Sequence, residues 1–137
     1  MRLLIWHVDA FLAEPTERGR SKVAETEPRA VYMDDGVVVF AAAEKADEAD
    51  PPAAALRAAE AIAQVAGQLG VKTVVLHSFA HLFTELAAPA IARDILNETQ
   101  SHLEARDYAV QQSAFGWFNR LEMRAKGHPL SRVARQV

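Results

Sequence analysis

Short apolar runs separated by polar stretches predict a chain in which strands and helices alternate. The run at residues 3–8 predicts a strand near the middle of a sheet, closed by Asp9. Residues 10–35 are polar and interrupted by prolines, so we expect an irregular segment with one short strand near 29–33. The acidic pair and the glycine at 34–36 are typical of a tight turn, and they predict a hairpin whose second strand continues to residue 45.

After residue 50 the apolar positions change from strand spacing to helix spacing. Residues 51–69 predict an α-helix, with Asp50 as its N-cap, Pro51 in its first turn and Gly70 after its last residue. Its expected apolar stripe is Leu56, Ala59, Ile62, Ala63, Ala66 and Leu69. A second helix is expected from Pro89 to Arg106, with Ile91, Ile95, Leu96 and Leu103 buried.

Three further strands complete the expected fold. Residues 71–76 are rich in β-branched side chains and predict a buried strand between the two helices. Residues 108–113 and 118–125 predict two more, joined at 114–117, and the residues from Ser131 allow a short helix. This order predicts an α/β fold, a mixed β-sheet domain with covering helices. Because the chain has 137 residues and no internal repeat, we expect residues 1–137 to form a single domain.

Composition and charge narrow the range of functions. The absence of cysteine excludes disulfides and thiolate metal sites. No apolar run is long enough to span a membrane and the opening residues do not form a signal peptide, so we expect a cytoplasmic protein. The net charge of −3 argues against sequence-blind wrapping of nucleic acid. Residues 114–137 carry 5 basic and 1 acidic side chains, against 10 and 17 over residues 1–113. That end is either a local surface for a phosphate-bearing RNA end or simply solvated.

The segment at residues 77–83 carries the main candidate chemistry. It places His77, Ser78 and His81 where a buried strand meets a loop, a usual place for ligand binding in α/β domains. The two histidines lack the further ligands of a metal motif, and Ser78 lacks the glycine-bracketed turn of a hydrolase nucleophile. We therefore expect no metal, no cofactor and no covalent catalysis. His81 either contacts a ligand or has a structural role.

Two other groups of residues leave a functional and a structural interpretation open. His7 and Asp9 point to the same side of a strand and form either a functional carboxylate–imidazole pair or a structural hydrogen bond. The aromatic cluster at residues 115–118 is either a stacking platform for bases or core packing at a hairpin. The residues alone predict an α/β domain with a ligand pocket of undefined chemistry.

Several segments in a fixed order resemble the N-terminal editing domain of archaeal threonyl-tRNA synthetases. These are residues 78–82, 85–89 and 94–97, then 114–116 and 126–130, with His7, Asp9, Glu44-Lys45 and Asp47-Glu48 in matching places. The resemblance spans essentially the whole chain and is weakest at residues 10–35. It implies a D-aminoacyl-tRNA deacylase-like fold, a homodimer and hydrolysis of mischarged seryl-tRNA(Thr). The implied partners are the 3′ aminoacyl end of tRNA(Thr) and the catalytic and anticodon-binding parts of the synthetase, in cis or in trans.

The resemblance also implies which residues bind the aminoacylated 3′ end. The main chain at Ala43, Glu44 and Lys45, with help from Ala92, would hold the terminal adenosine. The seryl pocket would be lined by Ser78, Phe79, Ala80 and His81 and completed by Phe115, Gly116, Phe118, Asn119 and Arg132. His128 is a further candidate if its turn folds back toward His81.

Four positions depart from the better-known members of that family. Phe118 and Asn119 stand where those members carry tyrosine and lysine, Arg132 replaces an acidic residue, and Ser78 replaces a proline. Phenylalanine has no proton to donate and asparagine is not a practical base. We therefore expect His81 and Asn119 to position the substrate, while the 2′-hydroxyl of the terminal adenosine assists the attacking water. The alternatives are a D-aminoacyl-tRNA deacylase, or a non-catalytic module that binds the acceptor end or dimerises.

Overall fold

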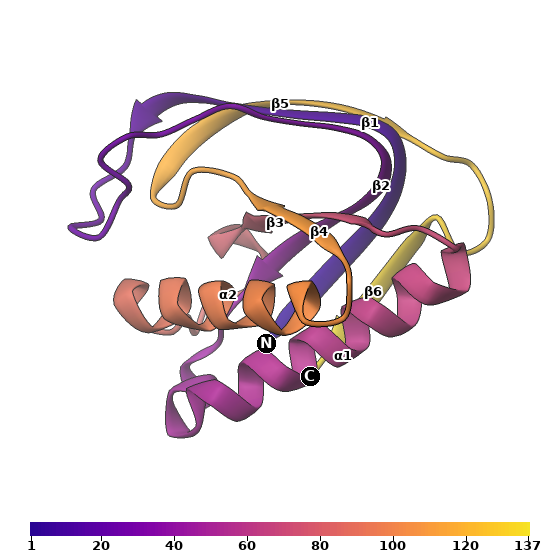
Figure 1. Ribbon diagram of the computed structural model, residues 1–137. Helices are drawn as coiled ribbons and strands as arrows, with labels where there is room; N and C mark the ends of the chain where they lie inside the picture. The colour runs from indigo at the N-terminus through magenta and orange to yellow at the C-terminus, as the bar shows by residue number, and fades with distance from the viewer.

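A computed structural model describes residues 1–137 as a six-stranded sheet with two α-helices (Figure 1). The strands are β1 (Arg2–Arg18), β2 (Val31–Ala42), β3 (Thr73–Ser78), β4 (Ala109–Gln112), β5 (Trp117–Ala125) and β6 (Arg132–Gln136). The helices are α1 (Pro51–Leu69) and α2 (Pro89–Glu104), and the short 3-10 helices η1 (Lys45–Ala49) and η2 (Ala80–Leu82) follow β2 and β3. None of the helices combines the length and the apolar composition needed to cross a membrane.

The sheet is mixed, and β1 lies in its interior. The strand order is β4-β3-β2-β1-β5. β6 pairs with residues 2–6 of β1 and β5 pairs with residues 8–18, so both strands lie on the same side of β1. β1 is antiparallel to β2, β5 and β6, whereas the β2–β3 and β3–β4 pairs are parallel. The predicted fold class, a mixed sheet with helices, is confirmed.

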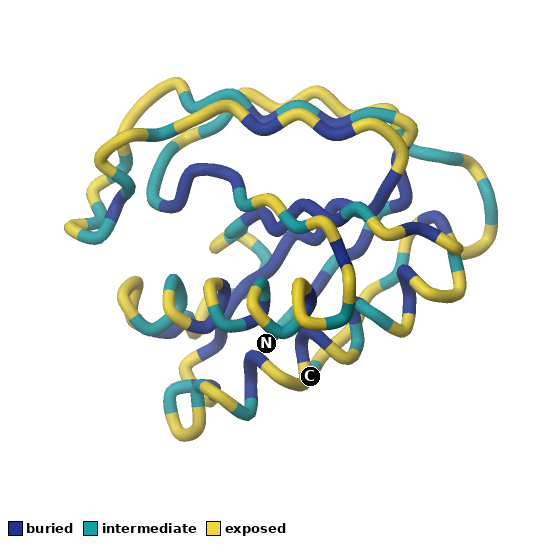
Figure 2. Tube along the Cα trace, viewed as in Figure 1, coloured by how far each residue is buried: buried dark blue, intermediate teal, exposed yellow.

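The main core lies between the sheet and the helices α1 and α2. Much of the buried face of α1 is alanine, which lets the helix lie close to its neighbours; Figure 2 shows this face as dark blue stretches along the helix. The predicted ends of α1 are confirmed, because the Asp50 side chain accepts a hydrogen bond from the Ala53 N–H and Gly70 ends the helix with a φ of 69°. α2 begins at Pro89 as predicted and ends at Glu104.

A second, smaller core contains no residue of α1 or α2. Side chains alternate along β2, so Val37 and Val39 enter the main core while Val38 and Phe40 enter the second. The distal parts of β1, β2 and β5 arch over β3 in Figure 1, and β1 and β2 supply most of this core. Phe11 of β1 is only 1 % exposed there. The bent sheet thus buries apolar surface on both of its faces.

The predicted loop at residues 10–35 is wrong over much of its length. β1 does not close at Asp9 but runs to Arg18, with Phe11 and Ala13 buried. Pro15 is tolerated because the register between β1 and β5 shifts between Pro15 and Glu17, as at a bulge. The connection to β2 is the loop at residues 19–30, and the predicted short strand overlaps the start of β2.

The predicted turn at residues 34–36 is also wrong, because these residues lie inside β2. Asp35 has a positive φ of 35°, which marks a local irregularity of the strand. Gly36 pairs with Val8, and a side chain at Gly36 would come within 2.5 Å of the Thr73 carbonyl oxygen. The glycine therefore permits close packing beside β3 and does not form a hairpin turn.

Four smaller predictions are corrected. β2 ends at Ala42, because the chain turns into η1 before residue 45. The residues after Ser131 form β6, paired to β1, and not a helix. β4 and β5 follow each other in the chain but lie at opposite edges of the sheet. Leu56 is 38 % exposed and lies outside the buried face of α1.

Candidate functional site

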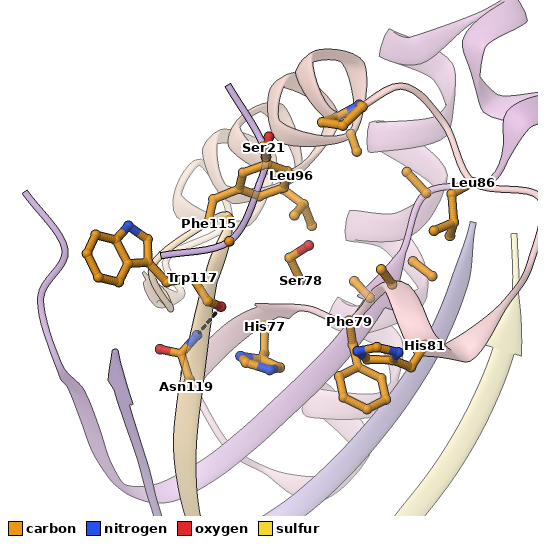
Figure 3. Close-up of a pocket in the computed structure, with 18 of the residues that line it drawn as sticks. Ser21, His77, Ser78, Phe79, His81, Leu86, Leu96, Phe115, Trp117 and Asn119 are labelled. Carbon is orange, nitrogen blue, oxygen red and sulfur yellow. Dashed lines mark hydrogen bonds between the residues drawn. The ribbon is translucent and has the colours of Figure 1, made fainter. Parts of the chain in front are cut away.

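A cavity of about 460 Å³ opens where β2 and β3 end side by side. Because these strands are parallel, their carboxyl ends reach the same edge of the sheet, where α/β proteins commonly bind ligands. The start of α2, the segment around the start of β5 and the loop after β1 form the other walls (Figure 3). The volume lies within the usual range of small-molecule sites.

Most residues predicted for the site line this cavity. They come from the end of β2, the segment after β3, the first turn of α2 and the region around the start of β5. They are Ala43, Ser78, Phe79, Ala80, His81, Ala92, Phe115, Gly116, Phe118 and Asn119. Segments far apart in the sequence thus meet at one place, while the role of each residue stays a prediction.

Glu44 lies beside the cavity but does not line it. Its carboxylate lies 3.2 Å from the Met1 ammonium and 3.0 Å from Nε of Arg2. Burial would raise the pKa of Glu44, but hydrogen bonds from Arg2 and the ammonium outweigh burial and lower the pKa. The side chain is therefore held as an anion at the N-terminus of the chain, away from the cavity.

The main chain next to Glu44 builds one wall of the cavity. Lys45 N–H donates to the carbonyl of Glu85 at 2.8 Å, and Ala87 N–H donates to the carbonyl of Ala43 at 3.0 Å. The Lys45 ammonium is paired with Glu48. These bonds fix the 85–87 segment to the end of β2. An adenosine bound by the main chain at residues 43–45 would have to use groups other than these.

His128 and Arg132 do not reach the cavity. His128 Nε2 lies 2.9 Å from His7 Nδ1, and the Arg132 guanidinium lies over the Trp6 ring at 4.8 Å. Burial, followed by the charges of Lys126 and His128, lowers the pKa of His7. The predicted pairing of His7 with Asp9 is wrong, because Asp9 pairs with Lys126 at 2.7 Å. The turn at residues 126–130 therefore packs against β1 and does not fold back toward His81.

His77, which the sequence places at a strand end suited to ligand binding but to which the family resemblance assigns no contact, lines the cavity. Its side chain is buried, and its Nδ1 lies 2.6 Å from Oγ of Ser113. Burial lowers the pKa of His77 to about 4, so the imidazole is neutral near pH 7. The ring lies edge-on to Phe40 with the centroids 5.3 Å apart. A lone polar residue at the end of an apolar strand was the only sequence signal for it.

His81 lies at the exposed rim of the cavity on η2. Its ring packs edge-on against Phe79, with the centroids 5.4 Å apart. Figure 3 shows the two rings beside each other, with Ser78 nearer the middle of the site. A ligand in the cavity could therefore contact a buried neutral imidazole, a hydroxyl and a rim imidazole.

Asn119 projects from β5 into the opposite wall. Its Nδ2 donates to the carbonyl of Trp117 at 3.0 Å, as the dashed line in Figure 3 marks. Its Oδ1 is buried and has no hydrogen-bond partner. Leaving a buried acceptor unpaired costs about 1–3 kcal/mol. A hydrogen-bond donor on a bound ligand would remove this cost.

The loop after β1 contributes Gly19, Arg20 and Ser21 to the cavity. It is held by Gly19 N–H, which donates to the carbonyl of Gly116 at 2.8 Å. Further along the loop, Trp117 Nε1 donates to the carbonyl of Glu25 at 2.9 Å. The sequence interpretation missed this wall, because residues 10–35 carry no motif and no regular apolar pattern.

The cavity lining is mainly apolar and contains no carboxylate side chain. Arg20 is its only permanently charged residue. The structure brings together no group of three or more histidine, cysteine, aspartate or glutamate side chains arranged to hold a metal ion. The cavity can thus bind through main-chain groups, an amide, hydroxyls and imidazoles, but it offers no acidic side chain as a general acid or base.

Solved structures define the class of fold. The whole chain superposes on 99 % of a structure described as "c-Myc DNA Unwinding Element Binding Protein", with a TM-score of 0.67 and 10 % identity. It also matches a "probable eukaryotic D-amino acid tRNA deacylase", with a TM-score of 0.58 and 13 % identity over 98 % of both chains. The chain therefore has a D-aminoacyl-tRNA deacylase-like fold.

Sequence comparisons define the family. Residues 1–137 match the family model described as the archaea-specific editing domain of threonyl-tRNA synthetase, and the chain belongs to this family. It is 41 % identical over 139 residues to a threonine–tRNA ligase of Methanopyrus kandleri and 36 % identical over 138 residues to one of Methanocaldococcus jannaschii. In both matches the whole chain covers only 22 % of the relative. The resemblance predicted from the sequence is confirmed.

Proposed function

We propose that this chain hydrolyses L-seryl-tRNA(Thr) and spares threonyl-tRNA(Thr). The observation that supports this most strongly is the convergence of segments 78–81 and 115–119 on one cavity of about 460 Å³, in a chain of the editing-domain family. Serine and threonine differ by one methyl group, which a single pocket discriminates by only about 1–3 kcal/mol. Because of this limit, a second site is needed to hydrolyse the mischarged seryl-tRNA(Thr).

The chemistry of the lining favours a mechanism in which the RNA supplies the reacting hydroxyl. Phe118 cannot donate a proton, Asn119 is not a practical base, and His77 is too weakly basic because its pKa is about 4. In the proposed step, water attacks the ester carbonyl and the bond to the ribose 3′ oxygen breaks. The water proton passes through the 2′-hydroxyl to the leaving 3′ oxygen. His81 and Asn119 position the ester, while the apolar walls exclude other water.

The test of this function compares two esters on the same tRNA. The chain should release serine from seryl-tRNA(Thr) and release threonine from threonyl-tRNA(Thr) about 10–200-fold more slowly, as expected for one methyl group in a pocket. Loss of acid-precipitable label over time measures both rates. The proposal would be wrong if the chain did not shorten the lifetime of seryl-tRNA(Thr), or if it shortened the lifetimes of both esters equally.

The role of the RNA is tested on the same assay. Replacing the terminal adenosine with its 2′-deoxy form should reduce hydrolysis to the background rate, because the proton path is lost. Asn119→Ala should reduce the rate by less than about tenfold, because it removes one positioning hydrogen bond. A larger loss with Asn119→Ala than with the 2′-deoxy substrate would place the essential group on the protein.

The same measurements distinguish the proposed function from two alternatives. The likeness to a D-amino acid tRNA deacylase makes D-aminoacyl esters the competing substrate, and D-aminoacyl-tRNA added to the assay decides between them. A non-catalytic module would bind the acceptor end without turnover. The proposed partners are the 3′ aminoacyl end of tRNA(Thr), a second copy of the chain and the remaining parts of a synthetase, in the cytoplasm.

A further inference from the structure

We infer that the segment Arg18-Gly19-Arg20-Ser21-Lys22, here termed the basic strap, binds the phosphodiester backbone that leads to the terminal nucleoside of a bound RNA. This inference rests on the proposed function, since it assumes that the cavity receives an RNA 3′ end. It adds a phosphate-binding element in the stretch of the chain where the family resemblance is weakest.

The basic strap is fixed at the mouth of the cavity. Gly19 N–H donates to the Gly116 carbonyl at 2.8 Å, and a side chain at Gly19 would come within 2.6 Å of that oxygen. Ser21 closes the following turn, because its Oγ accepts from Val23 N–H at 3.3 Å and its carbonyl accepts from Ala24 N–H at 3.2 Å. These bonds hold Arg20 beside the cavity that it lines.

The cations of the basic strap are free to meet an anion. Arg18, Arg20 and Lys22 are all exposed, and none forms an ion pair, whereas Arg93, Arg120 and Lys126 each pair with a carboxylate. The nearby Glu25 carboxylate accepts from Phe115 N–H at 3.0 Å and is not paired with the strap. Unpaired cations on a fixed segment suit the phosphates of a single-stranded RNA end.

The charges around the mouth of the cavity also favour one path for the RNA backbone as it leaves the cavity. Arg20 is the only permanently charged residue of the lining, and no lining residue is acidic. On the side of the cavity formed by Leu86 and Ala87, the adjacent Glu85 presents an exposed carboxylate. A polyanion leaving the cavity is therefore attracted toward the basic strap and repelled from the 85–87 segment.

The test measures binding and does not depend on hydrolysis. Two non-hydrolysable probes are used: seryl-adenosine with an amide in place of the ester, and a short single-stranded RNA that ends in the same amide-linked group. Only the second carries phosphates. Arg20→Gln should weaken binding of the RNA probe about tenfold, the loss expected for one charge-assisted contact, and should leave the nucleoside probe unchanged. Arg20→Lys should recover part of the loss.

The salt dependence of RNA binding measures how many phosphate contacts the basic strap makes. For the RNA probe, each lost phosphate contact should reduce the slope of log affinity against log salt by about 0.7. Combining Arg18→Gln, Arg20→Gln and Lys22→Gln should therefore flatten the slope most. Arg135→Gln, an exposed arginine on β6 outside the cavity lining, is the matched control and should change neither the affinity nor the slope.

The outcomes separate this inference from the proposed function. An equal effect of Arg20→Gln on both probes, or no effect on the RNA probe, would overturn the role of the basic strap even if seryl-tRNA(Thr) is hydrolysed. A phosphate-dependent loss in a chain that hydrolyses no ester would support the basic strap and overturn the hydrolase. Thermal unfolding of each variant verifies that the exposed substitutions leave the fold intact.

Discussion

The burial of His77 links the cavity wall to the pH dependence of stability. The pKa of His77 is about 4 in the folded chain, below its ordinary value of 6.5. Between these pH values the unfolded chain binds more protons, so the free energy of unfolding falls as the pH falls. Above about pH 6.5 the neutral His77 makes its full contribution to the free energy of unfolding. On the order of 3 kcal/mol of this contribution is lost by pH 4.

His77→Gln should make the stability of the chain less dependent on pH over this range. The amide keeps a polar partner for Ser113 but cannot titrate. Urea unfolding at several pH values between about 4 and 7 measures the free energy of each variant. His102→Gln, on the partly exposed face of α2, is the matched control. Parallel curves for the wild type and His77→Gln would contradict the argument.

At this scale the sequence identified residues that belong to motifs and missed those that do not. The resemblance to a family assigned Ser78 to His81 together with Phe115, Gly116, Phe118 and Asn119, and the structure brings these residues to one cavity. His77 was noted at the strand end but was left out of the family-based site, because a histidine within an apolar strand carries no motif of its own. His128 was misplaced, because nothing in a glycine–proline turn says which strand it packs against.

Elements with their own start and stop signals were predicted best. α1 and α2 have proline in their first turns, and α1 has a capping aspartate and a terminal glycine, so the local sequence is sufficient. The second half of β1 lacks such signals: it contains Pro15 and is stabilised by pairing with β2 and β5. Asp35-Gly36 was read as a turn because turns and strand irregularities use the same residues, and distant pairing decides between them.

The contact between the basic strap and the turn before β5 depends on Gly116. This residue has a φ of 77°, and a Cβ there would lie 2.6 Å from Cβ of Ala24. Gly116→Ala should therefore destabilise the chain by about 1–3 kcal/mol, through backbone strain and overpacking, and should loosen the loop that carries Arg20. The denaturant midpoint measures the loss of stability.

Gly127→Ala is the control for Gly116→Ala, because an added Cβ at Gly127 meets nothing within 4 Å. Its φ is not positive, so its effect on stability should be small. Adding Ala24→Gly to Gly116→Ala should restore part of the stability, since it removes the closest contact. Equal denaturant midpoints for Gly116→Ala and Gly127→Ala would show that the loop is not held in the way described.

At the scale of the whole molecule, the order of strands could not be derived from the pattern of elements. β4 and β5 are separated by four residues in the chain, yet they occupy opposite edges of the sheet. The intervening segment contributes Phe115 and Gly116 to the wall of the cavity. Local sequence sets neither the pairing of β5 with β1 nor the docking of the loop after β1, because both depend on contacts across most of the chain.

The open edge of β5 supports the proposed second copy of the chain. β5 pairs with β1 on one side and ends the sheet on the other. Phe118, Leu121 and Met123 are 59 %, 36 % and 39 % exposed along it, and exposed apolar side chains at an unpaired strand edge favour association. Two of the three, Phe118 and Leu121, also line the cavity.

Met123→Glu should therefore convert a dimer of the 15.0 kDa chain into a monomer, because it places a charge on the apolar edge. Sedimentation at several protein concentrations measures the mass, and Glu122→Gln, a neighbouring substitution that adds no charge to the edge, should leave the dimer intact. A wild-type chain that stays monomeric at micromolar concentration would contradict the dimer; a dimer that survives Met123→Glu would place the interface elsewhere. Because the second copy would cover the side of the cavity that Phe118 forms, the monomeric variant should also hydrolyse seryl-tRNA(Thr) more slowly, and the same samples measure both effects.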